Sequence, residues 1–431
     1  MNKKFIQKIY KESEKKLFKL NRSLTGKDNL KTLNFIKNYI PDLNIKKIKS
    51  RTKVYDWVIP DEWNVKDAFI EDKDGKKIIN FKKNNLHLIS YSINVDTNIR
   101  KKDLFKKIHY LKNLPEAIPY RTSYYKKDWG FCISYDYFNK LNRKYDQNDI
   151  FRVKINSNHD PRGKLVYGEY FIEGKTTDEI LISTYICHPS MANNELSGIL
   201  VSISLAKYFK NSKPQKGIRF VFIPETIGSI AYISKNLKNL KSNVIGGYNL
   251  TCIGDDRIHS CMLSKNKNSP SDESLFEAYE KLNIKKYKVY PFSKRGSDER
   301  QYCSPGVDLP ITSIFRSKYG EYKEYHTSLD NYHLMTVKGL LGGFRVAKKA
   351  IELLQKKIIP KNKILCEPNL GSRNLFRNNI SKDNFNIRNL LDFLQYTDGK
   401  TSLNLISKKI KLKLDKTFKL YKILLDKKII N

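Results

Sequence analysis

The sequence lacks any long hydrophobic run. None of its 431 residues falls in an apolar stretch approaching the roughly 18 residues that a membrane-spanning helix needs. The N-terminal segment, residues 1–16, carries a charge every few positions and has no apolar core of the kind found in secretion signals. We therefore expect an amphipathic helix at the start of a cytoplasmic protein that makes no membrane contact.

Paired cysteines are also missing. The six cysteines stand singly, no two of them form a CxxC spacing, and several lie in apolar segments such as the one around Cys252. Cysteine zinc knuckles and disulfide frameworks both show recurrent cysteine spacings, so neither is indicated. The pattern favours free, buried thiols in a reducing compartment.

Acidic residues and arginine are scarce relative to lysine. Lys and Arg together number 82 against 44 Asp and Glu, which gives a net charge of +38, yet only 16 of the 82 are Arg. Surfaces that bind phosphate or bases rely heavily on the planar guanidinium fork. Lysines spread along the whole chain are more typical of a composition bias, so the charge alone does not indicate a nucleic-acid partner.

The residues that are present suffice for folded domains. Hydrophobic residues make up 40% and aromatic residues 12% of the chain, a content that disordered proteins lack. At about 100–200 residues per domain, the length predicts two to four domains. We predict a main domain from residues 1–45 and 115–358, a β-rich inserted domain at 46–114 and a winged-helix domain at 360–431.

Local patterns support this division. The first forty residues have apolar positions at helical spacing, with stops at Gly26 and Pro41. The inserted domain has short β-type segments and a hairpin signal at Asp74-Gly75. The last seventy residues read as helix, turn, helix, helix and an apolar end, which is the order of a winged helix. From residue 360 onward, 16 basic residues face 6 acidic ones.

Strands alternate with helices in the main domain. Continuous apolar runs predict buried strands, and segments of helical periodicity follow them. This alternation predicts an α/β fold with a mostly parallel sheet flanked by helices. The predicted strands are 179–186, 217–223, 243–253 and 309–315, the helices are 197–209, 227–237, 272–282 and 337–357, and residues 163–174 predict a hairpin.

Histidine and glutamate side chains follow three of these strands. His188 and Glu225 come directly after two buried strands, and His326 follows a third after a short loop. Ligands of open α/β sheets bind beyond the carboxyl ends of the strands, so we expect these side chains to meet at one edge.

These residue types suit a hydrolytic zinc ion. Such an ion needs about three His or carboxylate ligands, an open position for water and a nearby carboxylate that takes the water's proton. His188 and His326 are the candidate imidazoles, and Glu195 and Glu225 are the candidate carboxylates. Glu195 equally suits the first turn of the following helix, and Glu225 suits a helix N-terminus. The HExxH signature is absent, which excludes a thermolysin-like site.

A second polar segment surrounds Gly296. Residues 295–303 crowd charged and polar side chains into one loop. Such a loop is ordinarily a solvated surface, but it is also suited to hold substrate, with Arg300 clamping a carboxylate. We take Asp298 and Arg300 as candidate substrate-binding residues.

Four long motifs give the chain a family resemblance. They are CHPSMANNELSG at 187–198, PETIGS at 224–229, GSDERQYCSPG at 296–306 and EYHTSLDN at 324–331. From about residue 10 to its end, the chain resembles the zinc aminopeptidase superfamily and, more closely, its bacterial aminopeptidase-like family. The resemblance implies a zinc-aminopeptidase-like fold with a β-rich insertion and a C-terminal winged helix. It also implies a metal-dependent hydrolase with a link to surface-polysaccharide biosynthesis.

The resemblance breaks down where a second metal ion would bind. Di-zinc relatives have a bridging Asp, a Glu-Glu pair and a further Asp. Here Asn194 replaces the first, Pro224-Glu225 replaces the pair, and Thr251 replaces the last. Neutral side chains cannot offset two divalent ions about 3.5–4 Å apart. We therefore expect at most one zinc ion per chain.

The resemblance also suggests roles for individual residues. His188 and His326 match the two histidine ligands of the family. Together with Glu195 they form the predicted metal site. Glu225 is then the catalytic base, and a ligand role for Glu225 remains the alternative.

Two functions from different classes follow. The first is a zinc-dependent aminopeptidase-like hydrolase acting on a small peptide or another amide, such as that of an amino-sugar precursor. The second is a catalytically retired domain that acts as a binding or regulatory protein through its winged helix. The expected third helix of that domain, around residues 414–428, has no Arg, so we favour packing against protein over DNA binding. The inserted domain is predicted to be a lid or a homodimer contact.

Overall fold

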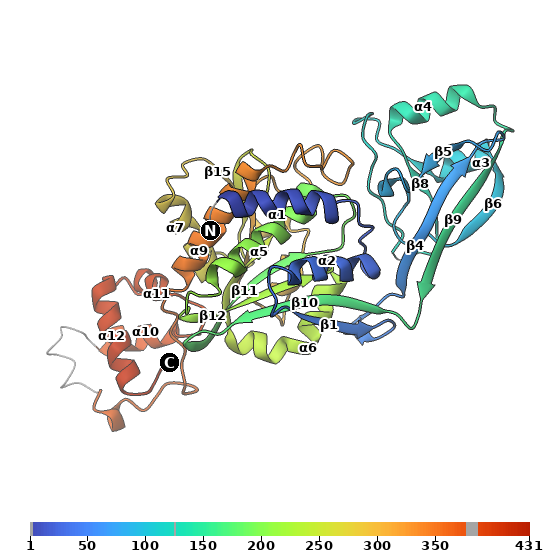
Figure 1. The fold of residues 1–431 in the computed structure, drawn as a ribbon. Helices are drawn as coiled ribbons and strands as arrows, with labels where there is room; N and C mark the ends of the chain where they lie inside the picture. The colour runs from blue at the N-terminus through green and yellow to red at the C-terminus, as the bar shows by residue number, and fades with distance from the viewer. Residues whose placement is uncertain (1–2, 125, 376–386) are drawn as a thin grey trace.

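The protein is divided into three parts in space (Figure 1). The structure, a computed structural model, describes residues 3–124, 126–375 and 387–431. A central α/β body lies between the β-rich inserted domain at one end and the C-terminal helical domain at the other. Within the described residues, no helix is long and apolar enough to cross a membrane.

The central body is built on one eight-stranded sheet. Its middle strands run parallel because helices connect them, and antiparallel strands flank them on both sides. The predicted strands at 179–186, 217–223, 243–253 and 309–315 are all present. In spatial order the strands are β1 (Asn44–Lys49), β10 (Lys164–Ile172), β12 (Lys216–Ile223), β11 (Thr176–Tyr185), β13 (Val244–Leu250), β16 (Ile311–Phe315), β14 (His259–Met262) and β15 (Tyr287–Tyr290).

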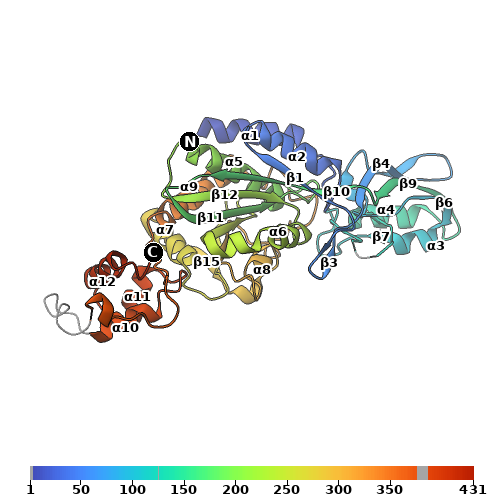
Figure 2. The same ribbon diagram turned by 90° about the horizontal axis from the view of Figure 1, so that it is seen from below.

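Helices cover both faces of this sheet, as Figures 1 and 2 show. Two separate hydrophobic cores result, one on each face. One face carries α1 (Lys3–Lys16), α2 (Lys27–Lys37), α5 (Ser197–Phe209), α7 (Pro270–Lys281) and α9 (Val337–Leu354), and the other carries α6 (Ile227–Asn243) and the short α8 (Glu299–Tyr302). The mostly parallel, helix-flanked α/β fold predicted from the sequence is confirmed.

The hairpin predicted at residues 163–174 is wrong. These residues form the single strand β10, which pairs with β1 on one side and β12 on the other. Gly168 lies in the middle of this strand, where a Cβ atom would come within 2.8 Å of the Leu33 side chain. The glycine therefore serves the close packing of α2 on the sheet.

The inserted domain is larger than its predicted range of 46–114. Its four-stranded sheet includes β9, which pairs with β4 and β6 and lies beyond residue 114, whereas β1 belongs to the central sheet. The predicted hairpin at Asp74-Gly75 joins β4 to β5, with Gly75 at a φ of 73°. The domain contains β2 (Lys53–Val54), β3 (Trp57–Val58), β4 (Glu62–Glu71), β5 (Lys77–Asn80), β6 (Val95–Arg100), α3 (Lys101–Leu104), β7 (Ile108–His109), β8 (Phe131–Cys132), α4 (Tyr135–Lys144) and β9 (Ile150–Asp160).

The C-terminal domain has the predicted winged-helix order. Helices α10 (Ile387–Gln395), α11 (Leu403–Lys409) and α12 (Leu414–Asp426) surround a small core of their own. The chain that leads into the domain takes part in its small sheet, because Lys361 pairs with Asp398 and Asn362 pairs with Ile430. The predicted apolar end of the chain is therefore strand-like.

The winged-helix domain lies against the central body near α7. Lys357 forms ion pairs with Glu277 at 3.2 Å and Glu273 at 3.7 Å, and the Ser402 hydroxyl donates to Glu273 at 2.6 Å. A cavity of about 860 Å³ separates the domain from the central body, and the starts of β11, β12 and β13 line it. The domain thus faces the amino-terminal edge of the parallel strands.

The cysteines follow the predicted pattern with one difference. All six are free thiols, and five are buried. Cys366, in the chain that leads into the winged-helix domain, is exposed instead.

Candidate active site

The carboxyl ends of the parallel strands bring three of the predicted residues together. β11 runs directly into His188, β12 runs into Glu225, and the loop after β16 carries His326. The Nε2 atom of His188 lies 3.7 Å from the Glu225 carboxylate, and the ring centres of His188 and His326 are 5.1 Å apart. The site is therefore assembled at the edge where the sequence predicted it.

His188 is held by a buried charge network at its other nitrogen. Its Nδ1 atom contacts the Glu195 carboxylate at 3.0 Å, and Glu195 in turn lies 3.6 Å from the Nε atom of Arg22. The same Arg22 Nε donates to the carbonyl oxygen of His188 at 3.0 Å. Because Glu195 engages Nδ1, the Nε2 atom, on the Glu225 side, is the ring nitrogen that this network does not hold.

Burial controls the protonation of this network. Burial, and then the Arg22 charge, lower the pKa of His188 to about 3. Burial raises the pKa of Glu195 to about 8, although Arg22 acts in the opposite direction. The His188 ring is therefore neutral at physiological pH, which is the form that binds metal ions.

His326 faces the same space with an unused donor atom. Its Nε2 atom is buried and has no hydrogen-bond partner within the described part of the chain. Burial, followed by the nearby His188, lowers the pKa of His326 well below its usual value. Its backbone takes a positive φ of 55°, and its ring stacks on Tyr325 at 3.9 Å. A buried, neutral imidazole without a partner is suited to accept a cation.

Glu225 is the carboxyl group next to the Nε2 atom of His188. Its side chain is 21% exposed, and burial followed by the neighbouring Asp298 charge raises the pKa of Glu225 to about 8. The next residue, Thr226, has a φ of 64°, which is unusual for a β-branched side chain. This sharp turn ends β12 and sets the direction of the Glu225 side chain before α6 begins.

The two predicted substrate-binding residues lie beside this turn. Asp298 is fully buried and accepts hydrogen bonds from the Thr226 N–H and the Ser229 hydroxyl, both at 2.8 Å. Burial raises the pKa of Asp298 to about 6. Arg300 is half-buried, donates to the Thr226 hydroxyl, and has a buried Nε atom without a partner in the described residues. Asp298 therefore stabilises the turn that carries Glu225. Arg300 keeps a buried N–H donor, its Nε, that has no partner in the described residues.

The residues that replace the second-ion ligands form a neutral cluster. The Tyr185 hydroxyl donates to Asn194 Oδ1 at 2.5 Å and also contacts the Thr251 hydroxyl. The Thr251 hydroxyl lies 3.1 Å from the Asn194 carbonyl oxygen. These oxygen atoms hydrogen-bond to one another, and none of the three side chains carries a charge.

Sequence analysis missed three residues of this site. Arg22 reaches it from the segment between α1 and α2, and Tyr120 reaches it from the inserted domain. Asp330 accepts hydrogen bonds from the N–H groups of Asn193 and Asn194 at 2.5 and 3.0 Å and so holds the turn that carries Glu195. Of the three, only Asp330 had a signal, because it belongs to the EYHTSLDN motif.

The residue types on the Nε2 side of His188 are those that hold catalytic zinc. Glu225 lies beside His188 there, and the ring of His326, which has an orphaned nitrogen, lies next to the His188 ring. On the other side, donor atoms of Cys187, His188 and Glu195 lie within 4.8 Å of one another. Arg22 occupies that side, and its positive charge opposes a cation. The neutral cluster around Asn194 offers no carboxylate for a second ion.

The fold and this edge define an aminopeptidase-like protein. A zinc aminopeptidase from Bacillus subtilis is similar in fold, with 14% sequence identity, a TM-score of 0.58, and coverage of 81% of this chain and 94% of that chain. A peptidase M28 precursor from Shewanella amazonensis is similar as well, with 10% identity, a TM-score of 0.56, and coverage of 85% of this chain and 98% of that chain.

The chain belongs to the family described as a domain of unknown function, DUF4910, whose model matches residues 11–357. A winged helix-turn-helix model matches residues 358–431. The chain is 38% identical over 400 residues to a candidate polysaccharide biosynthesis protein with an aminopeptidase-like domain from Clostridium acetobutylicum, covering 90% of this chain and 88% of that protein. It is also similar to the crystal structure of a candidate peptidase from the same organism, with 35% identity, a TM-score of 0.79, and coverage of 100% and 97%. The predicted family and the winged-helix domain are confirmed.

Proposed function

We propose that this protein is a zinc-dependent hydrolase that cleaves an amide bond, most simply an N-terminal peptide bond, with one zinc ion per chain. The observation that carries this proposal is that, at the carboxyl edge of the sheet, His188 lies next to both the His326 ring and the Glu225 carboxyl group. His188 and His326 would hold the ion through their Nε2 atoms. A zinc ion bound there supplies a Lewis acid and lowers the pKa of a bound water.

The protein's own residues divide the remaining work. Glu225 is close enough to take a proton from water or to serve as the third ligand. Glu195 acts in this proposal as a positioning residue, because it contacts His188 at Nδ1 and not on the open side. Asp298 fixes the turn that aims Glu225, and Arg300 is placed to bind a carboxylate or another anionic group of the substrate.

Glu225→Gln and Glu225→Ala test this proposal directly. We expect both variants to lose hydrolysis, while zinc content measured by plasma mass spectrometry separates the two roles. If the variants retain zinc, Glu225 acts as the base. If they lose zinc, Glu225 is a metal ligand. The control is Glu321→Gln, which changes an exposed carboxylate in the loop before His326. Full activity of Glu225→Gln on a confirmed substrate would refute the mechanism.

The name of the Clostridium acetobutylicum relative adds a substrate class to be tested. That protein is described by polysaccharide biosynthesis as well as by its aminopeptidase-like domain. We therefore include amides of amino-sugar precursors beside peptides as substrates. A screen over aminoacyl anilides, dipeptides and N-acyl amino sugars decides between them, and turnover of peptides alone would remove the sugar amides.

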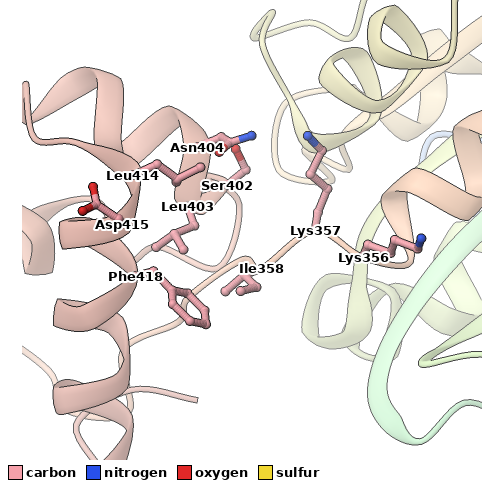
Figure 3. Close-up of a pocket in the computed structure, with 9 residues that line it drawn as sticks. All are labelled: Lys356, Lys357, Ile358, Ser402, Leu403, Asn404, Leu414, Asp415 and Phe418. Carbon is pink, nitrogen blue, oxygen red and sulfur yellow. The ribbon is translucent and has the colours of Figure 1, made fainter. Parts of the chain in front are cut away.

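We further infer that the winged-helix domain packs against protein in preference to reading a DNA duplex. In a helix-turn-helix, the first residues of the recognition helix contact bases. Here the first turn of α12, with Leu414 and Asp415, lines a cavity of about 450 Å³ together with Phe418, Ile358 and Lys357 (Figure 3). Leu414 and Asp415, at the start of α12, therefore border the cavity next to the linker that joins the domain to the central body.

DNA titration of the full-length protein tests this inference. We expect weak, sequence-independent binding that disappears between 50 and 200 mM salt, because Lys-rich surfaces bind phosphates through counterion release. Tight binding to one duplex sequence at physiological salt would overturn it.

A further inference from the structure

The chain returning from the inserted domain runs through the active site. Residues 117–124 are hydrogen-bonded to the loop that carries His326. The Ile118 N–H donates to the Ser328 hydroxyl at 3.0 Å, and the Ser328 N–H donates back to the Ile118 carbonyl at 2.8 Å. The Tyr120 N–H donates to the carbonyl of His326 itself, also at 2.8 Å. The segment is thus fixed to one of the proposed metal-binding residues.

The Tyr120 ring covers both imidazoles. Its centre lies 5.5 Å from that of His188 and 5.2 Å from that of His326, and in both cases the rings meet edge to face. Tyr120 is 9% exposed and His188 is 5% exposed, so little space remains between them. The imidazole pair is closed on the side of the inserted domain by an aromatic ring in contact with it.

The core of the inserted domain anchors this ring. The Tyr120 hydroxyl is hydrogen-bonded to that of Tyr124 at 2.7 Å, and the Tyr124 ring meets Tyr91 edge to face at 5.0 Å. Tyr91 stacks on Trp63 at 5.4 Å, and the buried Trp63 indole donates to the Ser92 carbonyl at 3.0 Å. A continuous row of aromatic side chains therefore links the inserted core to the site.

We propose that Tyr120 and Tyr124 form an aromatic wall that determines specificity by limiting the group bound beside the imidazoles to a small one. This proposal rests on the proposed hydrolase function. The open side of the site lies elsewhere, at Glu225 and the half-buried Arg300. Substrate enters from there, and the part of it next to His188 and His326 must fit against the wall. Small acyl groups fit, whether glycyl or alanyl from a peptide or acetyl from an amino sugar.

Chemical modification of the imidazoles tests the wall without any substrate. Metal-free wild type, Tyr120→Phe and Tyr120→Ala are treated with diethyl pyrocarbonate, and the modified histidines are quantified by peptide mass spectrometry. We expect roughly tenfold more modification of His188 and His326 in Tyr120→Ala, because the reaction of a buried group follows its access to solvent. Tyr120→Phe keeps the ring and should match wild type. The exposed His333 is the internal reference.

Two controls distinguish loss of the Tyr120 ring from a general opening of the inserted domain as the cause of faster modification. Tyr55→Ala removes an exposed tyrosine of the inserted domain that is remote in sequence from the wall. His159, whose ring meets Tyr91 at 5.7 Å, reports whether the inserted core opens. Unchanged reactivity of His188 and His326 in Tyr120→Ala, with the half-buried His159 reacting as in wild type, would refute the proposed wall. If His159 reacts faster than in wild type, the Tyr120→Phe and Tyr120→Leu pair replaces the alanine variant, and equal protection of His188 and His326 in that pair refutes the need for an aromatic ring.

A substrate comparison then tests specificity. Alanyl and phenylalanyl p-nitroanilides, and N-acetyl and N-benzoyl glucosamine, compare small with large groups on the two amide classes. Tyr120→Ala should shift the kcat/KM ratio toward the large group on the order of tenfold, the effect of relieving a steric limit in a pocket. An unchanged ratio in an active enzyme contradicts the specificity role. Absence of all hydrolysis and of bound zinc in wild type contradicts the proposed function instead, and the modification result still decides on the wall.

Discussion

The two halves of the active site differ in charge. On one half, His188 lies next to His326 and Glu225, and the Nε2 atom of His326 has no partner in the described chain. On the other half, Asn194 and Thr251 are hydrogen-bonded to Tyr185 and to each other. The comparison teaches that the capacity of a site to hold a cation depends on its imidazoles and carboxyl groups, and not on the number of polar residues there.

Removal of both imidazoles should have the largest effect on this contrast. In His188→Ala/His326→Ala we expect complete loss of the single zinc ion, because two of the proposed donors are gone. Plasma mass spectrometry on protein purified without a metal-affinity column measures the content, and His333→Ala is the control. Two zinc ions per chain in wild type would show that the neutral half, around Asn194 and Thr251, also binds an ion.

Weakening the support of one imidazole should have a smaller effect. Glu195→Gln keeps the shape of the side chain but removes the acidic group between Arg22 and His188. We expect zinc affinity to fall by about 10–100-fold, the usual cost of losing the partner that orients a ligand. Competition with a chromogenic chelator measures the affinity, and Glu280→Gln on the exposed face of α7 is the control. Complete loss of zinc would make Glu195 a direct ligand.

Adding a carboxylate to the neutral half should sharpen the comparison. Asn194→Asp places a buried acid beside Tyr185, where no cation is present, and we expect a loss of about 1–3 kcal/mol in the unfolding free energy of metal-free protein. Excess zinc should restore part of that loss and raise the zinc content above one per chain. Urea unfolding with and without zinc measures the loss of stability and its recovery, and plasma mass spectrometry measures the zinc content. A variant as stable as wild type, with unchanged zinc content, would refute the charge argument.

The smallest effect should come from removing a hydroxyl from the neutral half. Thr251→Val deletes the group that contacts Tyr185 and the Asn194 carbonyl. We expect the unfolding free energy to fall by about 1 kcal/mol, the typical value of one hydrogen bond, with zinc content unchanged. Urea unfolding and metal analysis check the two parts. Loss of zinc here would mean that the neutral half also supports the ion.

The order of strands and the meeting of three site residues could be predicted from the sequence. Continuous apolar runs identify buried strands without knowledge of their partners. The rule that parallel strands end at one edge then brings His188, Glu225 and His326 together. This reasoning works because each residue lies close in sequence to the strand that positions it.

The surroundings of those residues could not be predicted in the same way. Arg22 lies 166 positions before its partner His188, and no local pattern connects them. Tyr120 contacts His188 and His326, which are distant from it in the sequence, so no local pattern places it at the site. The role of Gly168 likewise depends on the packing of α2 against the sheet, which is a tertiary contact. Burial and pairing between distant segments decide these features.

The path into the winged-helix domain limits where its partners are held. Only residues 355–360 lie between the end of α9 and the first paired residue of that domain, Lys361. This length spans at most about 20 Å, so the domain cannot swing around the central body. The winged-helix domain lies at the amino-terminal edge of the parallel strands, whereas the imidazoles lie at the carboxyl-terminal edge. Under the proposed function, a macromolecule held by the winged helix and a substrate at the candidate active site would therefore occupy opposite ends of the same strands, and the one would not obstruct the other.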